Sequence, residues 1–203
     1  GTFDGQGHAI KGLTITTKAD NLGFFSFIGS TATVKNVSFT GAKVLGNKQA
    51  AIVAGQAENA TISNVYVSGY VTGCDHVGTI VGDARGDANV DTDGTNISNC
   101  VSTAAALSSD NQAGGIAGWT NLGMFEYNVA YGAVTAPNGG AAGICSMIDN
   151  NGHASFIGNV SAMPYAKGGN NRTSGILGWK NGSGCAIVDD DQNLSSDATQ
   201  YFV

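Results

Sequence analysis

Short apolar segments with an alternating pattern recur along the chain and predict β-strands. In the segment TISNVYVSG, which begins at Thr61, the apolar residue before Asn64 is Ile62, whereas those after it are Val65 and Val67. The inward positions therefore change parity at the asparagine, which one continuous strand cannot accommodate. Asparagine is one of the few residues that accept a left-handed backbone conformation, so we expect the chain to turn a corner at Asn64.

This pattern is one unit of an internal repeat. Related segments recur at intervals of 28 to 35 residues, each around one member of the set Asn36, Asn64, Asn99, Asn128, Asn159 and Asn193. A second, mostly glycine-bounded apolar segment precedes each of them: LGFFSF, AAIVAG, VGTIVG, GGIAGW, AGICSM and SGILGW. Neither segment spaces its apolar residues as a helix does. A period of about 20–50 residues is typical of solenoids, propellers and related arrays.

The repeat predicts an all-β fold, a right-handed parallel β-helix of about six coils with an asparagine ladder. Each unit has room for three short strands, and right-handedness follows the general bias of parallel crossovers. We expect the six asparagine side chains to stack about 4.8 Å apart inside the coil, buried and hydrogen-bonded to one another. Residues 1–203 then form one domain, with coils at roughly 1–45, 46–73, 74–108, 109–136, 137–168 and 169–203. A propeller is the alternative, but its blades need four antiparallel strands, which such a short unit barely holds.

The composition supports this fold and limits the partners. The 203 residues include 31 glycines and 2 prolines, and 12% are charged, which favours tight turns and flat strand surface over helix. Nine Lys plus Arg against fifteen Asp plus Glu give a net charge of -6 without a basic cluster, so we expect no nucleic-acid partner. No apolar run is long enough to span a bilayer, so we expect no transmembrane segment.

The four cysteines allow two interpretations. Cys74, Cys100, Cys145 and Cys185 could form two disulfides in a secreted protein. The repeat alignment instead places Cys100 and Cys145 in columns that hold small apolar residues in other units, and so predicts that both are core side chains. Cys74 and Cys185 fall in turn-like segments, where a bridge stays open as an alternative.

The segments GTFDGQGHAIKGLTI, GFFSFIG, ATVKNVSF, VGTIVGD, ATISNVYVSGYVTG and GGIAGW resemble those of proteins built from GLUG-motif repeats. The resemblance covers nearly the whole chain and is weaker in the last two units, where GICSM lacks the closing glycine. It implies a β-helical scaffold on a bacterial surface or in a secreted protein, without implying one activity. Such repeats also accompany catalytic domains, including bacterial peptidases that cleave immunoglobulin A, but no HExxH motif occurs in this sequence.

The segment GDANVDTDGTN in the third unit is the candidate metal site. Asp87, Asn89, Asp91 and Asp93 alternate ahead of Gly94, in partial agreement with a calcium-binding loop whose oxygen ligands wrap the ion. The glutamate expected at the twelfth position of such a loop is missing. Ca²⁺ is therefore the one cofactor that the sequence suggests, and a solvated acidic loop is the alternative.

Trp119 and Trp179, the two tryptophans, are the candidate ligand-binding residues. Both directly follow the closing glycine of their units, and Met147 holds the same column in the unit between them. In stacked coils the two indoles would lie roughly 10 Å apart, which suits the stacking of sugar rings along a chain. This platform predicts that both indoles are exposed to solvent, whereas the alternative is that they pack over the coil.

Together these features predict a non-catalytic binding or adhesion module for a glycan or a host protein, monomeric as a domain of a longer surface or secreted protein. A structural stalk or spacer is the second interpretation. An enzyme acting on polysaccharides is the third, but such enzymes need paired carboxylates, and the outward positions near the asparagines are mostly Ser, Tyr, Thr and Ala.

Overall fold

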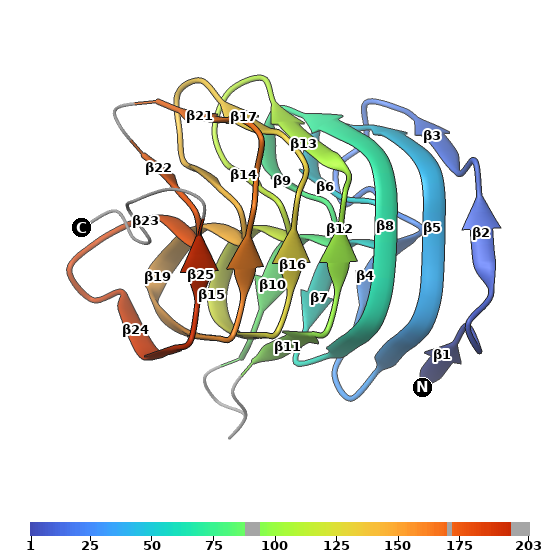
Figure 1. The fold of residues 1–203 in the computed structure, drawn as a ribbon, viewed down its shortest axis with the longest axis horizontal. Helices are drawn as coiled ribbons and strands as arrows, with labels where there is room; N and C mark the ends of the chain where they lie inside the picture. The colour runs from blue at the N-terminus through green and yellow to red at the C-terminus, as the bar shows by residue number, and fades with distance from the viewer. Residues whose placement is uncertain (88–93, 170–171, 196–203) are drawn as a thin grey trace.

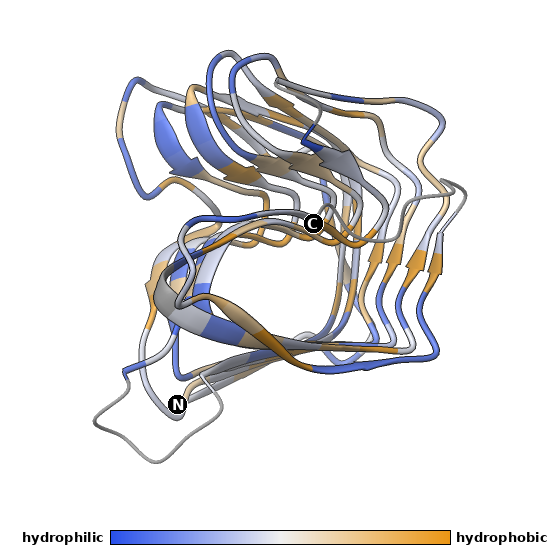
Figure 2. Ribbon diagram, turned by 90° about the vertical axis from the view of Figure 1, so that its left-hand side faces the viewer, coloured by the Kyte–Doolittle hydropathy of each residue, from blue (hydrophilic) through white to orange (hydrophobic). Residues whose placement is uncertain are grey.

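The computed structural model describes residues 1–87, 94–169 and 172–195, and these form a parallel β-solenoid of about six turns (Figure 1). The predicted all-β parallel coil is therefore confirmed. Seen along the stack, successive turns superimpose around one contour (Figure 2). In the described part of the chain there is no helix long and apolar enough to cross a membrane.

Each turn from the second to the sixth begins with a short strand of a small second sheet. These strands pair in parallel, one per turn, and are β6 (Lys48–Ala50), β9 (Asp75–Gly78), β14 (Ala113–Gly114), β18 (Ala141–Ala142) and β22 (Thr173–Ser174). A tight turn leads from each of them into the strand of the glycine-bounded segment. Those strands are β4 (Phe25–Ile28), β7 (Ala54–Glu58), β10 (Val81–Arg85), β15 (Ala117–Glu126), β19 (Cys145–Ile157) and β23 (Leu177–Lys180).

The asparagine segment supplies the strands on both sides of the corner. The strands before the corner are β1 (Thr2–Asp4), β5 (Thr33–Leu45), β8 (Thr61–Gly73), β11 (Thr95–Ser98) and β24 (Ala186–Asp191), while β15 and β19 run on to the same position. Both β5 and β8 continue through the corner, and the separate strands after it are β2 (Ala9–Lys11), β12 (Val101–Ser102), β16 (Val129–Ala130), β20 (Val160–Ser161) and β25 (Leu194–Ser195). The turn is completed by β3 (Thr14–Thr16), β13 (Ala105–Ser108), β17 (Val134–Ala136) and β21 (Ala166–Gly168).

The core is a set of columns in which the same position of successive turns stacks. One column pairs Val34 with Ile62, Ile62 with Ile97 and Ile97 with Phe125, and it ends in Phe156. The rings of Phe125 and Phe156 stack with their centroids 5.1 Å apart and their planes 8° apart. Parallel in-register stacking thus converts the sequence repeat into one continuous apolar interior.

Candidate functional site

The predicted asparagine corner exists, but in the first half of the stack its side chains face outward. Asn36, Asn64 and Asn99 have positive φ angles of 55°, 53° and 54°, as expected for a left-handed corner. Asn64 Nδ2 donates to Asn36 Oδ1 at 3.3 Å, and Asn36 Nδ2 donates to Asp4 Oδ1 at 3.1 Å. The side chains of Asn64 and Asn99 are exposed. The corner is confirmed for these three residues, whereas the prediction that their amides are buried is wrong.

In the second half of the stack the corner residue is the one before the asparagine. Positive φ angles of 54°, 61° and 55° belong here to Tyr127, Gly158 and Gln192. The register of β11 with β15 and of β12 with β16 places Tyr127 beside Asn99, and Asn128 beside Cys100. The three asparagines of this half therefore lie one position further along, where side chains point into the core. The six predicted ladder residues form two columns, because both positions accept asparagine for different physical reasons.

The inward column is a hydrogen-bonded ladder of the kind predicted, with three members. The N and Nδ2 atoms of Asn128 donate to Asn159 Oδ1 at 3.1 and 3.0 Å, and those of Asn159 donate to Asn193 Oδ1 at 2.9 and 3.0 Å. Asn159 Nδ2 also donates to Phe125 O at 2.8 Å, and Asn128 Oδ1 accepts a bond from Cys100 N at 3.0 Å. All three asparagines are buried. Their amides satisfy backbone groups of the preceding turn, so this column stabilises the fold.

Outside the corner, the outward amides line a shallow groove of about 390 Å³ that crosses several turns. We call it the corner groove, and its lining residues are Gly7, Asn36, Val37, Ser38, Asn64, Val65, Tyr66, Asn99 and Val101. None of these residues carries a formal charge. The Tyr66 hydroxyl lies 3.0 Å from Thr103 Oγ1 of the next turn, which fixes the ring across two turns of the surface. The groove therefore combines amides with an oriented aromatic ring.

The corner groove continues into a flat surface formed by the strands after the corner, which run side by side across the front of Figure 1, and the two share Ser38, Tyr66 and Val101. We call this flat surface the post-corner face. Its central column, set by the register of the strands, is Ser38, Tyr66, Val101, Val129, Val160 and Leu194. Tyr127 and Tyr131 border the column and are 54% and 47% exposed. An outward row of apolar residues on a protein surface is a feature that needs a physical explanation.

The tryptophan platform is not present in the structure. Met147 pairs with Trp179, and the register of β15 with β19 puts Trp119 beside Met147, so the predicted shared column is correct. However, Trp119 is only 5% exposed and Met147 only 3%. The Trp119 ring stacks on His76 at 5.6 Å, and Arg172 lies 3.5 Å from the centroid of the Trp179 ring. The prediction of two exposed indoles is therefore wrong, because His76 of the second sheet covers Trp119, and Arg172 lies over the half-buried ring of Trp179.

The glycine before this column explains the close approach of the second sheet. A Cβ atom at Gly118 would lie 2.4 Å from the backbone carbonyl carbon of His76, and one at Gly82 would lie 2.6 Å from that of Gln49. The fifth turn has Ser146 at this position, and its hydroxyl donates to Gly140 O at 2.7 Å. The serine that replaces the closing glycine in GICSM is thus accommodated by a hydrogen bond across the turn between the second sheet and the strand of the glycine-bounded segment, which we call the inner bend.

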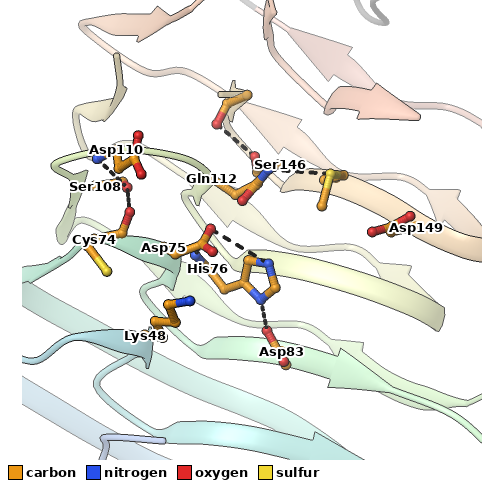
Figure 3. A network of polar contacts seen from close by, with 12 residues as sticks. Lys48, Cys74, Asp75, His76, Asp83, Ser108, Asp110, Gln112, Ser146 and Asp149 are labelled. Atoms are coloured by element: carbon orange, nitrogen blue, oxygen red, sulfur yellow. Dashed lines mark hydrogen bonds and ion pairs between the residues drawn. The ribbon is translucent and has the colours of Figure 1, made fainter. Parts of the chain in front are cut away.

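A buried polar network occupies the inner bend, and Figure 3 shows His76 pointing at Asp83. His76 Nδ1 lies 2.6 Å from Asp83 Oδ1, and Arg85 Nη2 donates to Asp83 Oδ2 at 2.6 Å. Burial lowers the pKa of His76, but the hydrogen bond to Asp83 and the charges of Asp83 and Asp75 outweigh it, so the pKa is raised. No sequence motif marks this network, although Asp83, a charged residue in the tryptophan column of the third unit, is a signal of it.

The pair of His76 and Asp83 corresponds to two members of a catalytic triad, in which a buried aspartate orients a histidine. A triad also needs a nucleophile beside the other ring nitrogen of the histidine. Here the Nε2 atom of His76 faces Asp75 Oδ1 at 3.7 Å. Cys74, two residues away, is bonded elsewhere, because its Sγ donates to Asn47 Oδ1 at 3.0 Å. The geometry therefore favours a structural role in joining the two sheets.

The four cysteines are free thiols. Cys100 and Cys145 are fully buried, as predicted for core residues, and burial raises the pKa of each to about 12. Burial, and next the charge of Asp75, also raise the pKa of the Cys74 thiol. The alternative of a bridge at Cys74 or Cys185 is thus not what the structure shows.

The candidate calcium loop lies largely outside the described residues, which exclude Asn89, Asp91 and Asp93. Asp87 is described, and its backbone N donates to Asn59 Oδ1 at 3.3 Å. Within the described ranges, no group of three or more His, Cys, Asp or Glu residues is arranged to hold a metal ion. The calcium site stays a prediction.

Comparison with known proteins gives a fold but no family, since no family model matches the chain. Over 83 residues, or 40% of its length, the chain is 37% identical to Halomucin of Haloquadratum walsbyi, and it spans about 1% of that protein. A solved structure from Bacteroides ovatus, described as a candidate immunoglobulin A1 protease, has a TM-score of 0.79 at 23% identity. That match covers 97% of this chain and 60% of the other. At this identity the likeness shows the fold alone.

Proposed function

We propose that this chain is a non-catalytic binding module of a longer surface or secreted protein, and that it binds an extracellular glycan or protein through the post-corner face. The observation that carries the proposal is the uncharged outward column from Tyr66 to Leu194. Its members are half-buried, except for the exposed Leu194, and the exposed Tyr127 and Tyr131 border it. Exposed contiguous apolar surface on a soluble protein marks interaction sites, and tyrosine is enriched in them.

The scaffold suits this role because it holds the surface in a fixed geometry. Parallel pairing runs through successive turns, so neighbouring residues of the column stay about 4.8 Å apart. The buried hydrogen bond between Asn128 and Asn159 joins two turns at the residues that directly precede Val129 and Val160 of the face. A partner therefore meets a surface that loses little conformational freedom on binding.

The surface or secreted location is part of the proposal. The segment related to Halomucin, a mucin by name, supports it, as does the bacterial surface placement that the GLUG resemblance implies. The chain spans a small part of one relative and 60% of the other, which fits one module among several in a longer protein.

An enzymatic role is the alternative that the name of the Bacteroides ovatus protein raises. The closest approach to catalytic geometry in the described part of the chain is the pair of His76 and Asp83. The His76 ring stacks on Trp119, its Nε2 atom faces Asp75 Oδ1, and its side chain is only 18% exposed. A catalytic base must reach its substrate. The binding role therefore accounts better for the exposed surface than hydrolysis accounts for the buried pair.

The proposal is tested by biolayer interferometry of the purified chain against a panel of extracellular glycoproteins and polysaccharides, with parallel assays for released peptide or sugar. We expect saturable binding without product. Val129→Asp, which places a charge in the middle of the face, should weaken binding at least tenfold. Val188→Asp is the matched control, because Val188 is an exposed valine on β24, before the corner.

Two results would contradict the proposal. Product formation that Asp83→Asn abolishes would show an enzyme instead. Binding that Val129→Asp and Val188→Asp weaken equally would place the site elsewhere. If nothing on the panel binds, the spacer interpretation replaces the binding one.

A further inference from the structure

The corner groove differs from the rest of the asparagine column in what its amides do. In the inward ladder the amides of Asn128 and Asn159 are consumed by backbone and neighbouring amide groups. In the groove, Asn64 makes one side-chain bond, at 3.3 Å to Asn36, and both Asn64 and Asn99 are exposed. An amide offers two donors and an acceptor with two lone pairs. The fold stability does not require this outward row, which leaves it available for a ligand.

The spacing and the neighbours of these amides specify the kind of ligand. Successive amides recur at one strand step, about 4.8 Å, along a line parallel to the stack. Vicinal hydroxyl groups on successive rings of a sugar chain present donors and acceptors at a comparable repeat. The Tyr66 ring, held by its contact with Thr103, supplies the flat apolar surface on which the face of a sugar ring packs.

The electrostatics of the groove select against charged ligands. No lining residue is ionised near neutral pH. Asp4, which accepts a bond from Asn36 Nδ2 at 3.1 Å, is paired with Lys35 at 3.7 Å. A phosphate, sulfate or uronate would lose hydration here without meeting an opposite charge. A neutral ligand carries no charge, so its binding avoids this loss of charge hydration.

From these observations we infer that the corner groove is a binding site for a neutral carbohydrate chain. The chain runs along the stack, with its hydroxyl groups bonded to Asn64 and Asn99 and one ring packed on Tyr66. This inference rests on the proposed binding function and narrows it to one site and one class of ligand.

The test uses a glycan array that carries neutral, sialylated, sulfated and uronate-containing oligosaccharides, followed by calorimetry with the neutral oligosaccharide that binds best. The variant Asn64→Gly/Asn99→Gly removes both amides and keeps the corner, because glycine adopts positive φ freely and Gly158 holds the same position in the fifth turn. We expect wild-type protein to bind neutral glycans, and the double variant to bind at least tenfold more weakly with an unchanged far-UV spectrum.

One further groove variant and two controls separate the groove from the surface in general. Tyr66→Ala should also weaken binding at least tenfold. The matched controls are Asn138→Gly, which removes an exposed asparagine with one bond to the preceding turn, and Tyr165→Ala, which removes an exposed tyrosine outside the groove. Neither control should change the affinity more than twofold.

The inference is overturned if the groove variants bind like wild type, if only charged glycans bind, or if the array stays blank. Its failure is distinguishable from failure of the proposed function. Binding to an enzymatically deglycosylated protein that survives Asn64→Gly/Asn99→Gly and is lost in Val129→Asp would remove the carbohydrate site and keep the binding module. Absence of binding to every glycan and protein would remove both.

Discussion

Replacing Asn159 by alanine should be one of the most costly single substitutions in the asparagine columns. Asn159 Oδ1 accepts bonds from the N and Nδ2 atoms of Asn128, and its Nδ2 donates to Phe125 O and Asn193 Oδ1. The alanine variant deprives two buried backbone groups, Asn128 N–H and Phe125 C=O, of their side-chain partner. At about 1–3 kcal/mol for each unsatisfied buried group, we expect a loss of about 2–6 kcal/mol in the free energy of unfolding.

Replacing an asparagine of the outward column should have a much smaller effect on the free energy of unfolding. Asn64→Gly loses one exposed bond of 3.3 Å and keeps the left-handed backbone, so the loss should stay below about 1 kcal/mol. Both variants are compared by urea unfolding followed by tryptophan fluorescence. Trp119 and Trp179 lie in the fourth and sixth turns, on either side of Asn159. Far-UV circular dichroism recorded in parallel detects partial unfolding, which stacked repeats permit.

The reasoning fails if Asn159→Ala costs no more than Asn64→Gly. That result would mean that water or a shift of the neighbouring turns replaces the lost bonds. A fall in the urea m-value with an unchanged midpoint would instead point to a change in the cooperativity of the stack.

Three further predictions concern the inner bend and the core. The pKa of His76 is raised, so its pairing with Asp83 stabilises the fold fully below the unfolded-state pKa of 6.5, and this contribution is lost as pH rises through the folded-state pKa. NMR titration of His76 should give a midpoint above 6.5 that falls in Asp83→Asn. A wild-type midpoint below 6.5 would contradict the prediction. Cys100 and Cys145, with pKa values of about 12, should resist alkylation at pH 8 until urea unfolds the chain, as mass spectrometry of labelled peptides will show; labelling at the rate of a free thiol would refute their burial. Gly118→Ala should cost more than about 3 kcal/mol, because its Cβ would overlap the His76 backbone, and an unchanged melting temperature would show that the two sheets can separate at no cost.

The sequence was sufficient for the period, the parallel stack and the columns of the glycine-bounded segment, because spacing alone determines them. It failed at the asparagines, where identical letters were aligned although the structure shifts them by one position. The signal was present in the spacing from the last inward apolar residue: Asn64 lies two positions after Ile62, whereas Asn128 lies three positions after Phe125. Asparagine suits both a left-handed corner and a buried ladder, so identity could not decide between them.

The exposure of the tryptophan column could not be derived from the repeat. A strand residue beside a glycine is exposed or covered according to what packs across the inner bend, and that depends on a contact between His76 and Trp119 from different turns. The corner groove could not be derived from the repeat either. The repeat predicts inward amides at Asn36, Asn64 and Asn99, whereas the structure turns them outward beside Tyr66.

The inward ladder also has a direction, which bears on how such a chain can diverge. The Oδ1 atom of the first member, Asn128, accepts a bond from a backbone N–H of the turn before it, that of Cys100. The Nδ2 atoms of Asn128 and Asn159, in contrast, each donate to an acceptor in the turn that follows, as Asn128 does to Asn159 Oδ1. At the far end, Asn193 finds that acceptor in Asp190 of its own turn. An asparagine arising at position 100 would meet Asn128 Oδ1 at once, so the ladder can lengthen towards the N-terminus by single mutations. Growth at the other end would require a new acceptor at the same time, and lineages of this repeat should therefore vary in where the ladder starts more than in where it stops.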